Sequence, residues 1–418
     1  MSTYSLRYGR SEAHLEIDDR LLRAQLRPAE VPGLADVTAA VRASLSHPTG
    51  TPPLSEMLDG KHSALILTVD HTRPSPAPLL LPLLDVLHQA RVRPTLCVAT
   101  GRHRQMTPEE LQRHFTPEVL ARVRLVQHDP FAEGAFENLG RTGRGTGVVV
   151  NREVLKHDIV LGVGTIEPSY LAGFSGGRKL IMPGVAHHRS IDANHFLLTD
   201  PATRIGVLDG NPLSEDCGEF AARVPFHFIC YSVVGPNDEI VGVFAGDPVA
   251  AHRLGCGMSR AIYEVAPVRA GIVVTTVGGY PYDCDLVQGK KGVVPAAALV
   301  EEGGAIVILA ECAEGLGAEP TFLEWLRTRT PWQVREDVGR RDLFSLGAHG
   351  ASILARPIVE RKATVILVAC PEVCAAMDGT FVQAVESLDL GWRLARDLSA
   401  DPDSVVILHG ARRLIVGS

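Results

Sequence analysis

The chain has 418 residues and a formal net charge of −7, with 45% hydrophobic and 21% charged residues. This composition is close to that of an average globular protein and predicts two or three domains. The negative charge argues against the basic surface of a nucleic-acid-binding protein. No stretch of about 18 apolar residues occurs, and Met1 to Arg7 lack the apolar core of a signal peptide, so we expect a cytoplasmic protein without a membrane span.

The first half of the chain alternates strand-like and helix-like segments. Apolar strand-like runs lie at 64–69, 95–99, 158–163 and 226–234, and an apolar helical face spans 79–91. Thr107-Pro-Glu-Glu110 is typical of a helix start, with Thr as N-cap, Pro at the first position and Glu at the third. Such alternation predicts a parallel sheet flanked by helices, and continuous apolar runs are typical of strands buried on both faces.

The pattern restarts after about Pro267. Strand-like runs lie at 271–277, 305–309 and 363–368, with helical segments near 294–301 and 321–328. We therefore predict an α/β fold of two domains, residues 1–266 and residues 267–403. A last strand at 404–408 fits either domain, so residues 404–418 could complete the first one.

The eight cysteines form no C-x-x-C pair, and several lie in apolar strand-like runs such as Pro94 to Ala99. We expect them to be reduced core residues rather than ligands of a zinc ion.

Polar, basic or glycine-rich segments follow four of the predicted strands. They are Asp70-His-Thr-Arg-Pro74, Thr100-Gly-Arg-His-Arg104, the stretch from Gly164 to Lys179, and Gly278-Gly-Tyr-Pro-Tyr-Asp283, which leads to Gln288 and Lys291. In open parallel sheets, ligands bind beyond the carboxyl ends of the strands. The pattern favours a site for an anionic ligand.

The segment Ser175-Gly-Gly-Arg-Lys179 has the residue types of a phosphate-binding loop. Paired glycines let the backbone approach a ligand, and their N–H groups can hold phosphate. The spacing differs from that of a Walker A loop, because no Ser or Thr follows the lysine. An ordinary Gly-Gly turn with solvated basic residues is an equally good interpretation.

Three of the sixteen histidines, His71, His103 and His195, have surroundings that indicate chemistry. His103 stands between two arginines directly after a strand, where a histidine, with an ordinary pKa of about 6.5, suits a general base. His195 could bind a metal through one ring nitrogen, although taken alone a surface or capping role would be the plainer interpretation. The pair His187-His188 has the right residue type for a metal site, but adjacent side chains seldom point the same way.

Together these residues resemble the nickel-pincer lactate racemases and their homologues. The most specific block runs from Glu167-Pro168 through Ala172-Gly-Phe-Ser-Gly-Gly-Arg-Lys179 to Val185, and its spacing to His195 agrees. The resemblance extends from the Asp70 segment to Gln288-Gly-Lys-Lys291 and covers most of the chain.

The resemblance implies two α/β domains, each with a largely parallel sheet flanked by helices, and a cofactor in the cleft between them. The cofactor of the family is the nickel complex of pyridinium-3,5-bisthiocarboxylic acid mononucleotide, bound covalently to a lysine that corresponds to Lys179. The histidine that ligates nickel corresponds to His195, and soft sulfur donors with an imidazole suit square-planar nickel. The residues expected to contact the rest of the cofactor are Asp70, Thr72, Arg73, Ser175, Gly176, Gly177 and Arg178.

The chemistry that the resemblance implies is racemisation or epimerisation of a 2-hydroxy acid. A histidine corresponding to His103 removes the hydroxyl proton while the C2 hydride moves to the cofactor, and the hydride returns to the other face of the keto acid. Arg73, Gln288 and Lys291 correspond to substrate-binding residues. The implied partners are a small 2-hydroxy acid and the enzymes that make the cofactor.

One position departs from the family. Lactate racemases carry a second catalytic histidine directly after the Glu-Pro pair, where this chain has Ser169. A serine hydroxyl is too weak an acid or base to substitute unaided near neutral pH. Either another group such as Tyr170, His71, His128 or a carboxylate serves instead, or the substrate is a larger or more polar hydroxy acid, such as a sugar acid, that Ser169 helps to bind.

Three other interpretations stay open. The chain could be an oxidoreductase that uses the same cofactor and stops at the keto acid, although no haem, flavin or iron–sulfur motif supplies an electron acceptor. It could be a non-catalytic homologue that binds an anion or a nucleotide, although Lys179, His195 and His103 would then have no evident role. Without the resemblance, Ser175 to Lys179 would suggest a phosphotransferase, which the missing Walker spacing disfavours.

Overall fold

The computed structural model describes residues 1–317 and 319–417. The chain divides into two compact units. The central unit is Glu30–Ile262, and the terminal unit, which contains both chain ends, combines Met1–Ala29 with the residues from Tyr263 onward. Among the described residues, no helix has the length and apolar character needed to cross a membrane.

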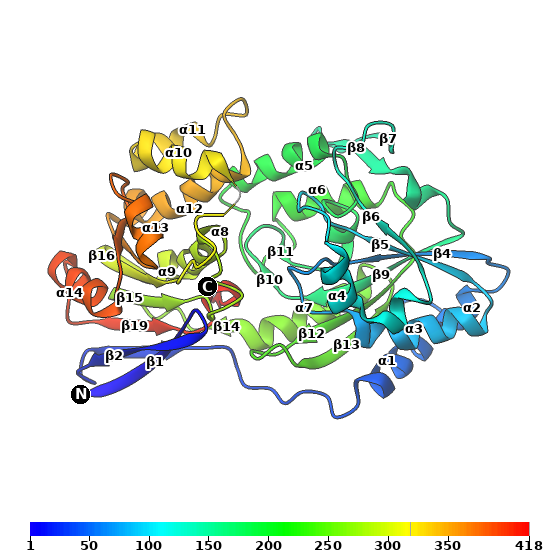
Figure 1. Ribbon diagram of the computed structural model, residues 1–418, viewed down its shortest axis with the longest axis horizontal. Coiled ribbons are helices and arrows are strands. Elements are labelled where there is room, and N and C mark those ends of the chain that lie inside the picture. The colour runs from blue at the N-terminus through cyan, green and yellow to red at the C-terminus, as the bar shows by residue number, and fades with distance from the viewer. Residues whose placement is uncertain (318, 418) are drawn as a thin grey trace. The chain divides into compact units, whose positions relative to one another are not determined.

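The central unit is built on a six-stranded sheet in the order β13-β12-β9-β4-β5-β6 (Figure 1). The strands are β4 (Ser63–Thr68), β5 (Arg93–Val98), β6 (Arg124–Gln127), β9 (Ile159–Ile166), β12 (Phe228–Val234) and β13 (Ile240–Gly246). All neighbours pair in parallel except β12 and β13, which are antiparallel. Every residue of β9 and β12 is buried, which explains why their sequences read as continuous apolar runs.

Helices cover both faces of this sheet. Helices α1 (Val37–Ser46) and α3 (Ala77–Gln89) pack together against one face and form a core with β4, β5, β9 and β12. Helix α4 (Pro108–Leu120) packs on α3 and begins with the capping box predicted at Thr107 and Glu110. Helix α7 (Ala250–Tyr263) packs near the end of β9, where Gly255 lies against Ile166.

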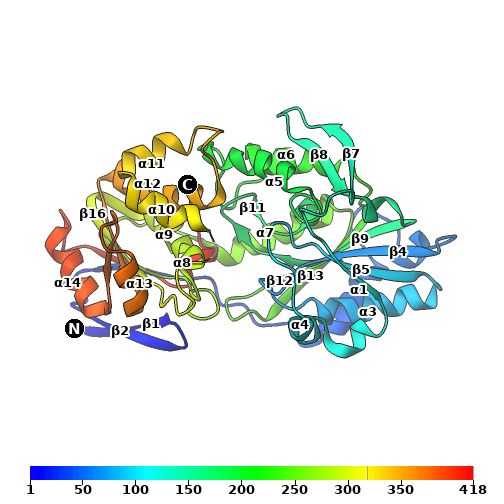
Figure 2. The ribbon, with the colours of Figure 1, turned by 45° about the horizontal axis from the view of Figure 1, so that its top comes forward.

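Further elements complete the central unit. They are α2 (Leu54–Met57), β7 (Phe136–Arg141), β8 (Gly147–Asn151), η1 (Arg152–Leu155), β10 (Pro168–Ser169), β11 (Gly173–Phe174), η2 (Gly177–Leu180), α5 (His188–His195), η3 (Phe196–Thr199) and α6 (Pro212–Ala221). Helices α5 and α6 lie side by side, and α6 also packs on η2 (Figures 1 and 2).

The terminal unit has its own six-stranded parallel sheet in the order β18-β17-β16-β15-β19-β3. Its strands are β3 (Leu22–Leu26), β15 (Ala270–Thr276), β16 (Val300–Leu309), β17 (Thr364–Val368), β18 (Gln383–Val385) and β19 (Val405–Leu408). The hairpin of β1 (Ser2–Tyr8) and β2 (Ser11–Ile17) and helix α14 (Leu388–Leu398) share a core with this sheet. Helices α9 (Val293–Leu299) and α12 (Leu346–Arg361) also pack on it.

Smaller elements complete the terminal unit. They are β14 (Glu264–Val265), α8 (Leu286–Gly289), η4 (Lys290–Gly292), α10 (Pro320–Thr328), α11 (Pro331–Asp337), α13 (Pro371–Ala376), η5 (Ala411–Arg413) and β20 (Ile415–Val416). Helices α10 and α11 pack on α12.

The structure confirms the predicted fold class: two α/β units, each with a mainly parallel sheet flanked by helices. It divides the chain differently at the ends, however. Residues 1–29, expected in the first domain, belong to the terminal unit, because β3 pairs in parallel with β19. For the same reason the strand predicted at 404–408 completes the second sheet and not the first; Ser418, the last residue of that segment, lies outside the described residues.

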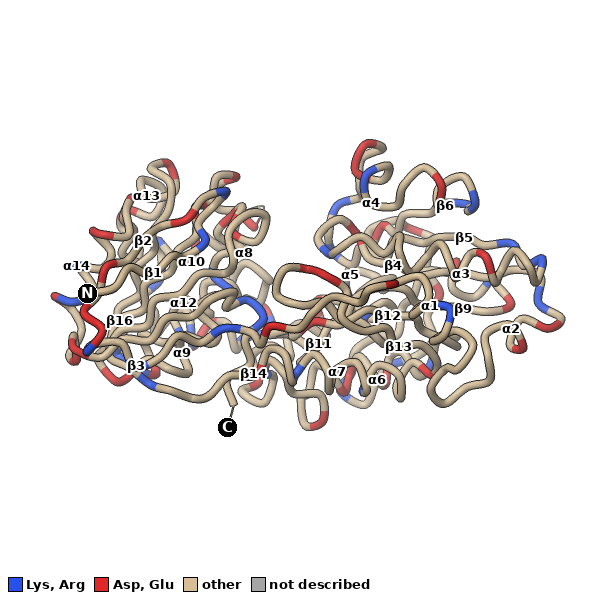
Figure 3. Tube along the Cα trace, turned by 90° about the horizontal axis from the view of Figure 1, so that it is seen from below, with Lys and Arg blue, Asp and Glu red and all other residues tan. Residues whose placement is uncertain are grey.

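The cysteines agree with a further expectation from the sequence. All eight cysteines are free thiols, and five of them are buried. Acidic and basic residues are interspersed along both units (Figure 3).

Candidate active site

The predicted site residues of the central unit follow the carboxyl ends of three adjacent strands. The loop after β4 carries Asp70, Thr72 and Arg73, the loop after β5 carries His103, and the chain after β9 carries Ser169 and the Ser175 to Lys179 segment. Adjacent parallel strands end at the same edge of a sheet, so these loops meet there. A backbone bond from Gly101 N to Gly184 O, 3.0 Å long, joins the second loop to the third segment.

Asp70 orients the imidazole of His103. Nδ1 of His103 lies 2.6 Å from Oδ2 of Asp70, and Oδ1 of Asp70 accepts hydrogen bonds from the backbone N (3.0 Å) and Oγ1 (2.5 Å) of Thr72. Burial alone would raise the pKa of the Asp70 carboxyl, but the bonds from His103 and Thr72 and the charge of Arg73 hold it well below its ordinary value. A carboxylate only accepts hydrogen bonds, so Nδ1 of His103 carries a proton and Nε2 is the ring nitrogen that can act as a base.

Arg73 is held beside the same end of β9. Its Nε lies 4.0 Å from Oε2 of Glu167, and its Nη1 donates to the backbone oxygen of Thr72 at 2.8 Å. The Glu167 side chain is 5% exposed and that of Arg73 34% exposed, so the ion pair anchors the guanidinium while part of it faces solvent. An anchored, accessible guanidinium suits a carboxylate or a phosphate.

Ser175 shapes the glycine loop from within. Its hydroxyl donates to the backbone oxygen of Thr165 at 2.9 Å and accepts from the backbone N of Glu167 at 2.8 Å. Both hydrogen bonds of the Ser175 hydroxyl are therefore made to the backbone at the end of β9.

Gly177 is required by close packing. The residue has a φ of +54°, and a Cβ there would lie 2.8 Å from Cγ of His252. His252 in turn contacts the backbone oxygen of Ser175 through Nε2 at 2.8 Å, and Tyr231 donates its hydroxyl to the backbone oxygen of Gly177 at 3.2 Å. The loop is therefore a fixed structure and not a solvated turn.

Lys179 presents a partly buried amine at the end of this loop. Its Nζ donates to Oγ of Ser169 at 3.4 Å. Burial and the nearby charge of Arg73 lower the pKa of Lys179 to about 8. A much larger fraction of this amine is neutral near pH 7 than of an ordinary lysine, which favours nucleophilic attack.

Arg178 lies across the neighbouring helix α6. A Cβ on Gly218 would come within 2.2 Å of Nη1 of Arg178, so the guanidinium occupies the space that a side chain at position 218 would need.

His195, the last residue of α5, is buried and neutral. It is 5% exposed, and burial together with the charges of Lys179 and Arg102 lowers its pKa to about 3. Within the part of the chain that the structure describes, its Nδ1 has no hydrogen-bond partner. A buried neutral imidazole is the form that binds a metal ion, so this position fits a nickel ligand.

The structure separates the candidates for a second acid or base near Ser169. His128 is fully buried, and its two ring nitrogens lie 3.1 Å from the backbone oxygen of Ala186 and 3.2 Å from Nδ2 of Asn151, which leaves neither for chemistry. His71 is exposed. Burial raises the pKa of Tyr170 to about 12, although the charge of Arg73 opposes that rise. Tyr170 is thus within electrostatic reach of the site, whereas His128 is a structural residue.

Gln288 and Lys291 belong to the terminal unit, where they lie in α8 and η4. Lys291 donates its Nζ to Oε1 of Gln288, and Asp285 caps the start of α8 by accepting from the backbone N of Gln288 at 2.7 Å. The two side chains therefore act as one polar pair.

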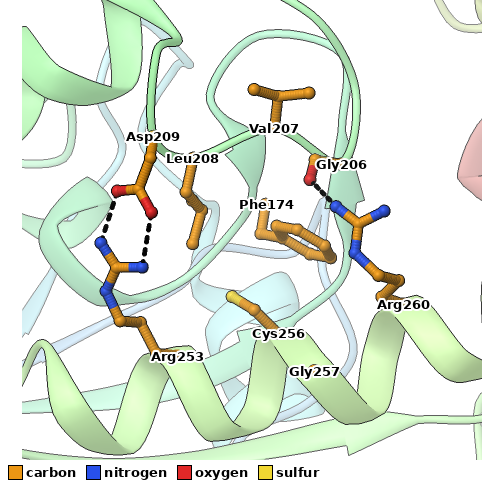
Figure 4. A pocket seen from close by; sticks show the side chains of 9 residues that line it. All are labelled: Phe174, Gly206, Val207, Leu208, Asp209, Arg253, Cys256, Gly257 and Arg260. Atoms are coloured by element: carbon orange, nitrogen blue, oxygen red, sulfur yellow. Dashed lines mark hydrogen bonds and ion pairs between the residues drawn. The ribbon is translucent and has the colours of Figure 1, made fainter. Parts of the chain in front are cut away.

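A cavity of about 380 Å³ lies beside the glycine loop in the central unit (Figure 4). Phe174, the loop from Gly206 to Asp209 and one face of α7 line it. Its two arginines are already engaged: Arg253 forms a double ion pair with Asp209, and Arg260 donates to the backbone oxygen of Gly206 (Figure 4).

The sequence analysis missed two features of this site. It assigned Asp70 to the cofactor, and no motif indicated that Asp70 contacts His103. It also overlooked Asp216 on α6, which is 1% exposed and accepts three side-chain hydrogen bonds. The only local signal is an acidic residue on the apolar face of a helix.

Two family models match the chain: the lactate racemase N-terminal domain over residues 8–206 and the lactate racemase C-terminal domain over residues 265–416. A curated lactate racemase of Thermoanaerobacterium thermosaccharolyticum is 31% identical over 427 residues, which cover 100% of this chain and 99% of the relative. A lactate racemase of Lactiplantibacillus plantarum is 33% identical over 328 residues, 76% of this chain and 77% of the relative.

Solved structures show the same likeness. The lactate racemase apoprotein from Thermoanaerobacterium thermosaccharolyticum superposes with a TM-score of 0.92 at 31% identity, covering 100% of both chains. A crystal structure of a Thermotoga maritima protein has a TM-score of 0.69 at 19% identity, covering 91% of this chain and 98% of the other, and shows a shared fold alone.

Proposed function

Because this chain belongs to the lactate racemase family, we propose that it racemises or epimerises a 2-hydroxy acid with a nickel-pincer nucleotide bound covalently to Lys179. The chain is an isomerase that acts on hydroxy acids. The cofactor, the residue roles and a substrate other than lactate are the proposal.

The observation that carries the proposal is the arrangement of three groups in one unit. A lysine with a lowered pKa, a buried neutral histidine and a carboxylate-oriented histidine all follow the carboxyl edge of one sheet. They suit, in turn, a covalent attachment point, a metal ligand and a general base. His195 would supply one ligand to the nickel ion, and the sulfur and carbon atoms of the nucleotide would supply the others.

Each residue then has a separate task. When bound, the nickel-pincer nucleotide supplies a reversible acceptor for the C2 hydride of the substrate. Nε2 of His103 takes the hydroxyl proton and gives it back, while Asp70 holds the ring. Arg73 holds an anionic group near the same edge, and Arg178 with the backbone of Gly176 and Gly177 holds the phosphate. Gln288 and Lys291 are proposed substrate contacts from the terminal unit.

The serine at position 169 favours the hypothesis of a substrate that is larger or more polar than lactate. A serine is smaller than the histidine of lactate racemases, and its hydroxyl already contacts the amine of Lys179. Attachment of the cofactor to that amine would remove its positive charge, and the Ser169 hydroxyl would then be available to bind a further oxygen of the substrate. We therefore propose a sugar acid or another large 2-hydroxy acid.

A stereochemical assay on loaded protein tests the reaction. Single enantiomers of hydroxy acids are incubated with the enzyme, and both stereoisomers and keto acid are measured. The proposal predicts a mixture of stereoisomers at equilibrium without build-up of keto acid, and loss of turnover with intact cofactor in His103→Ala. Accumulation of keto acid would favour the oxidoreductase, and binding without turnover would favour the non-catalytic homologue.

A further inference from the structure

Helix α6 packs against the two elements that carry Lys179 and His195, the residues proposed to hold the cofactor. It packs on η2, which carries Lys179, and on α5, which ends at His195 (Figure 2). Three consecutive residues of α6, Asp216, Cys217 and Gly218, make the contacts toward these two elements.

Asp216 is a buried carboxylate with three donors. It accepts from Oγ1 of Thr142 at 2.5 Å, from Oγ1 of Thr146 at 2.8 Å and from Nδ2 of Asn194 at 2.8 Å. A buried carboxylate is tolerated when such donors replace its lost hydration, and removal of one partner leaves a costly unsatisfied group. The carboxylate thus joins α6, the turn between β7 and β8, and α5.

Asn194 connects this carboxylate to the position of His195. It is fully buried and directly precedes His195 in the last turn of α5. Besides its bond to Asp216, its Nδ2 reaches the backbone oxygen of Leu213 at 3.4 Å, and its Oδ1 lies 3.6 Å from Sγ of Cys217. Both ends of the Asn194 amide are therefore fixed by α6.

His195 needs such support from its helix. Metal-binding histidines are usually oriented by a hydrogen bond from the second ring nitrogen to a neighbouring group. Among the described residues the ring of His195 interacts with the backbone of Ile191 in its own helix, and its Nδ1 has no hydrogen-bond partner on another element, so the direction of the ring depends on how the last turn of α5 is held. The fixed amide of Asn194 holds that turn.

We propose that Asp216 is a positioning residue that, through Asn194, holds His195 in the direction required for nickel. The inference rests on the proposed function. It assigns to Asp216 the task that a direct hydrogen-bond partner of the ligand performs in other metal sites, where loss of such a partner typically weakens metal binding by about 10- to 100-fold.

Asp216→Asn tests the proposal, because it keeps the size of the side chain and replaces one acceptor oxygen by a donor. Asp158→Asn is a control that makes the same substitution at an exposed carboxylate of the same unit. Asp158 also accepts three hydrogen bonds within the central unit, from the backbone N of His62 and from the backbone N and Oγ of Ser63. It precedes β9 and so stands at the amino end of the sheet, away from the loops that carry the site. Thr146→Val, which removes a single donor, is a milder second variant.

The proteins are produced together with the cofactor-making enzymes. Covalent adduct is measured by intact mass, nickel retention by exposure to a chelator, and the nickel site by its charge-transfer absorption. For Asp216→Asn we expect adduct close to the wild-type level, nickel loss about tenfold faster and a shifted absorption band. Thr146→Val should show a smaller change of the same kind, and Asp158→Asn should lower thermal stability without either change.

Two results would overturn the inference: wild-type nickel retention in both Asp216→Asn and Thr146→Val, or equally fast nickel loss in Asp158→Asn, which would indicate general destabilisation. Failure of the proposed function has a different signature, since the wild-type protein itself would then carry neither adduct nor nickel.

Discussion

Nδ1 of His103 lies 2.6 Å from Oδ2 of Asp70, and this contact joins the loops that follow two adjacent strands. It assigns the proton to Nδ1 and leaves Nε2 to act as the base. Replacing Asp70 by Asn would present either an amide oxygen or an amide N–H to the ring and so permit the wrong tautomer. We expect kcat of the loaded Asp70→Asn enzyme to fall by about 100-fold, within the range of general-base effects.

Stereoisomer interconversion and intact mass, measured on the same sample, check this prediction. The adduct should persist, because Asp70 contacts the base and not the tether. A variant with wild-type kcat would show that the Asp70 contact is not needed for the base.

Because Asp70 is ionised in the folded protein, we expect the thermal stability of the fold to depend on pH. The folded protein holds the pKa of Asp70 below its ordinary value of about 3.9, so the ionised carboxylate stabilises the fold. That contribution is fully present above the unfolded pKa and is lost as pH falls through the lower folded pKa. Thermal unfolding of wild type and Asp70→Asn between pH 3 and pH 7 should show the wild-type advantage near neutral pH and its decline below about pH 4. A constant difference across that range would contradict the expected ionisation.

Ser169→His tests whether the departure at this position sets the choice of substrate. A histidine there would restore a second ring beside Lys179 and the end of β9. We expect lactate racemisation to appear and turnover of the larger natural substrate to fall. Ser169→Asn, similar in polarity but without a useful base, is the control for added bulk. Equal lactate activity in the two variants would show that a base at position 169 does not set the choice of substrate.

Gly218→Ala tests the placement of Arg178. The new Cβ would displace the guanidinium, whose Nη1 lies within 2.2 Å of its expected position. Alanine is favoured over glycine in a helix by about 1 kcal/mol, so thermal stability should not fall. Loading of the cofactor should weaken by about tenfold, the equivalent of one charge-assisted hydrogen bond. Gly257→Ala in α7, where a Cβ meets nothing within 4 Å, is the matched control and should load normally.

Much of this site could be predicted because its residues follow strands with strong local signals. The apolar runs of β4, β5 and β9 indicated where the sheet ends, and the polar segments after them, with Asp70, His103 and Lys179, lie where parallel strands place ligands. The predicted capping box at Thr107 and Glu110 is likewise a local pattern, and the structure confirms it.

Long-range pairings could not be predicted in this way. The donors to Asp216 from Thr142 and Thr146 stand 74 and 70 residues earlier, and no spacing rule links them. The short strand β3 pairs with β19 from the other end of the chain, so nothing near residues 22–26 indicated to which unit they belong. The tautomer of His103 also depends on a contact between two loops rather than on either loop's sequence.

The measurement that tests the central claim most directly is peptide mapping by mass spectrometry, with metal analysis, of protein produced alongside the cofactor-making enzymes. Lys179, which is partly buried, and Lys290, which is buried, both have pKa values lowered to about 8, so nucleophilicity alone does not choose between them. We predict the adduct on the Lys179 peptide only, nickel in proportion to the adduct, and no adduct in Lys179→Arg. An unmodified Lys179 without nickel, under conditions that load a known lactate racemase, would contradict the account.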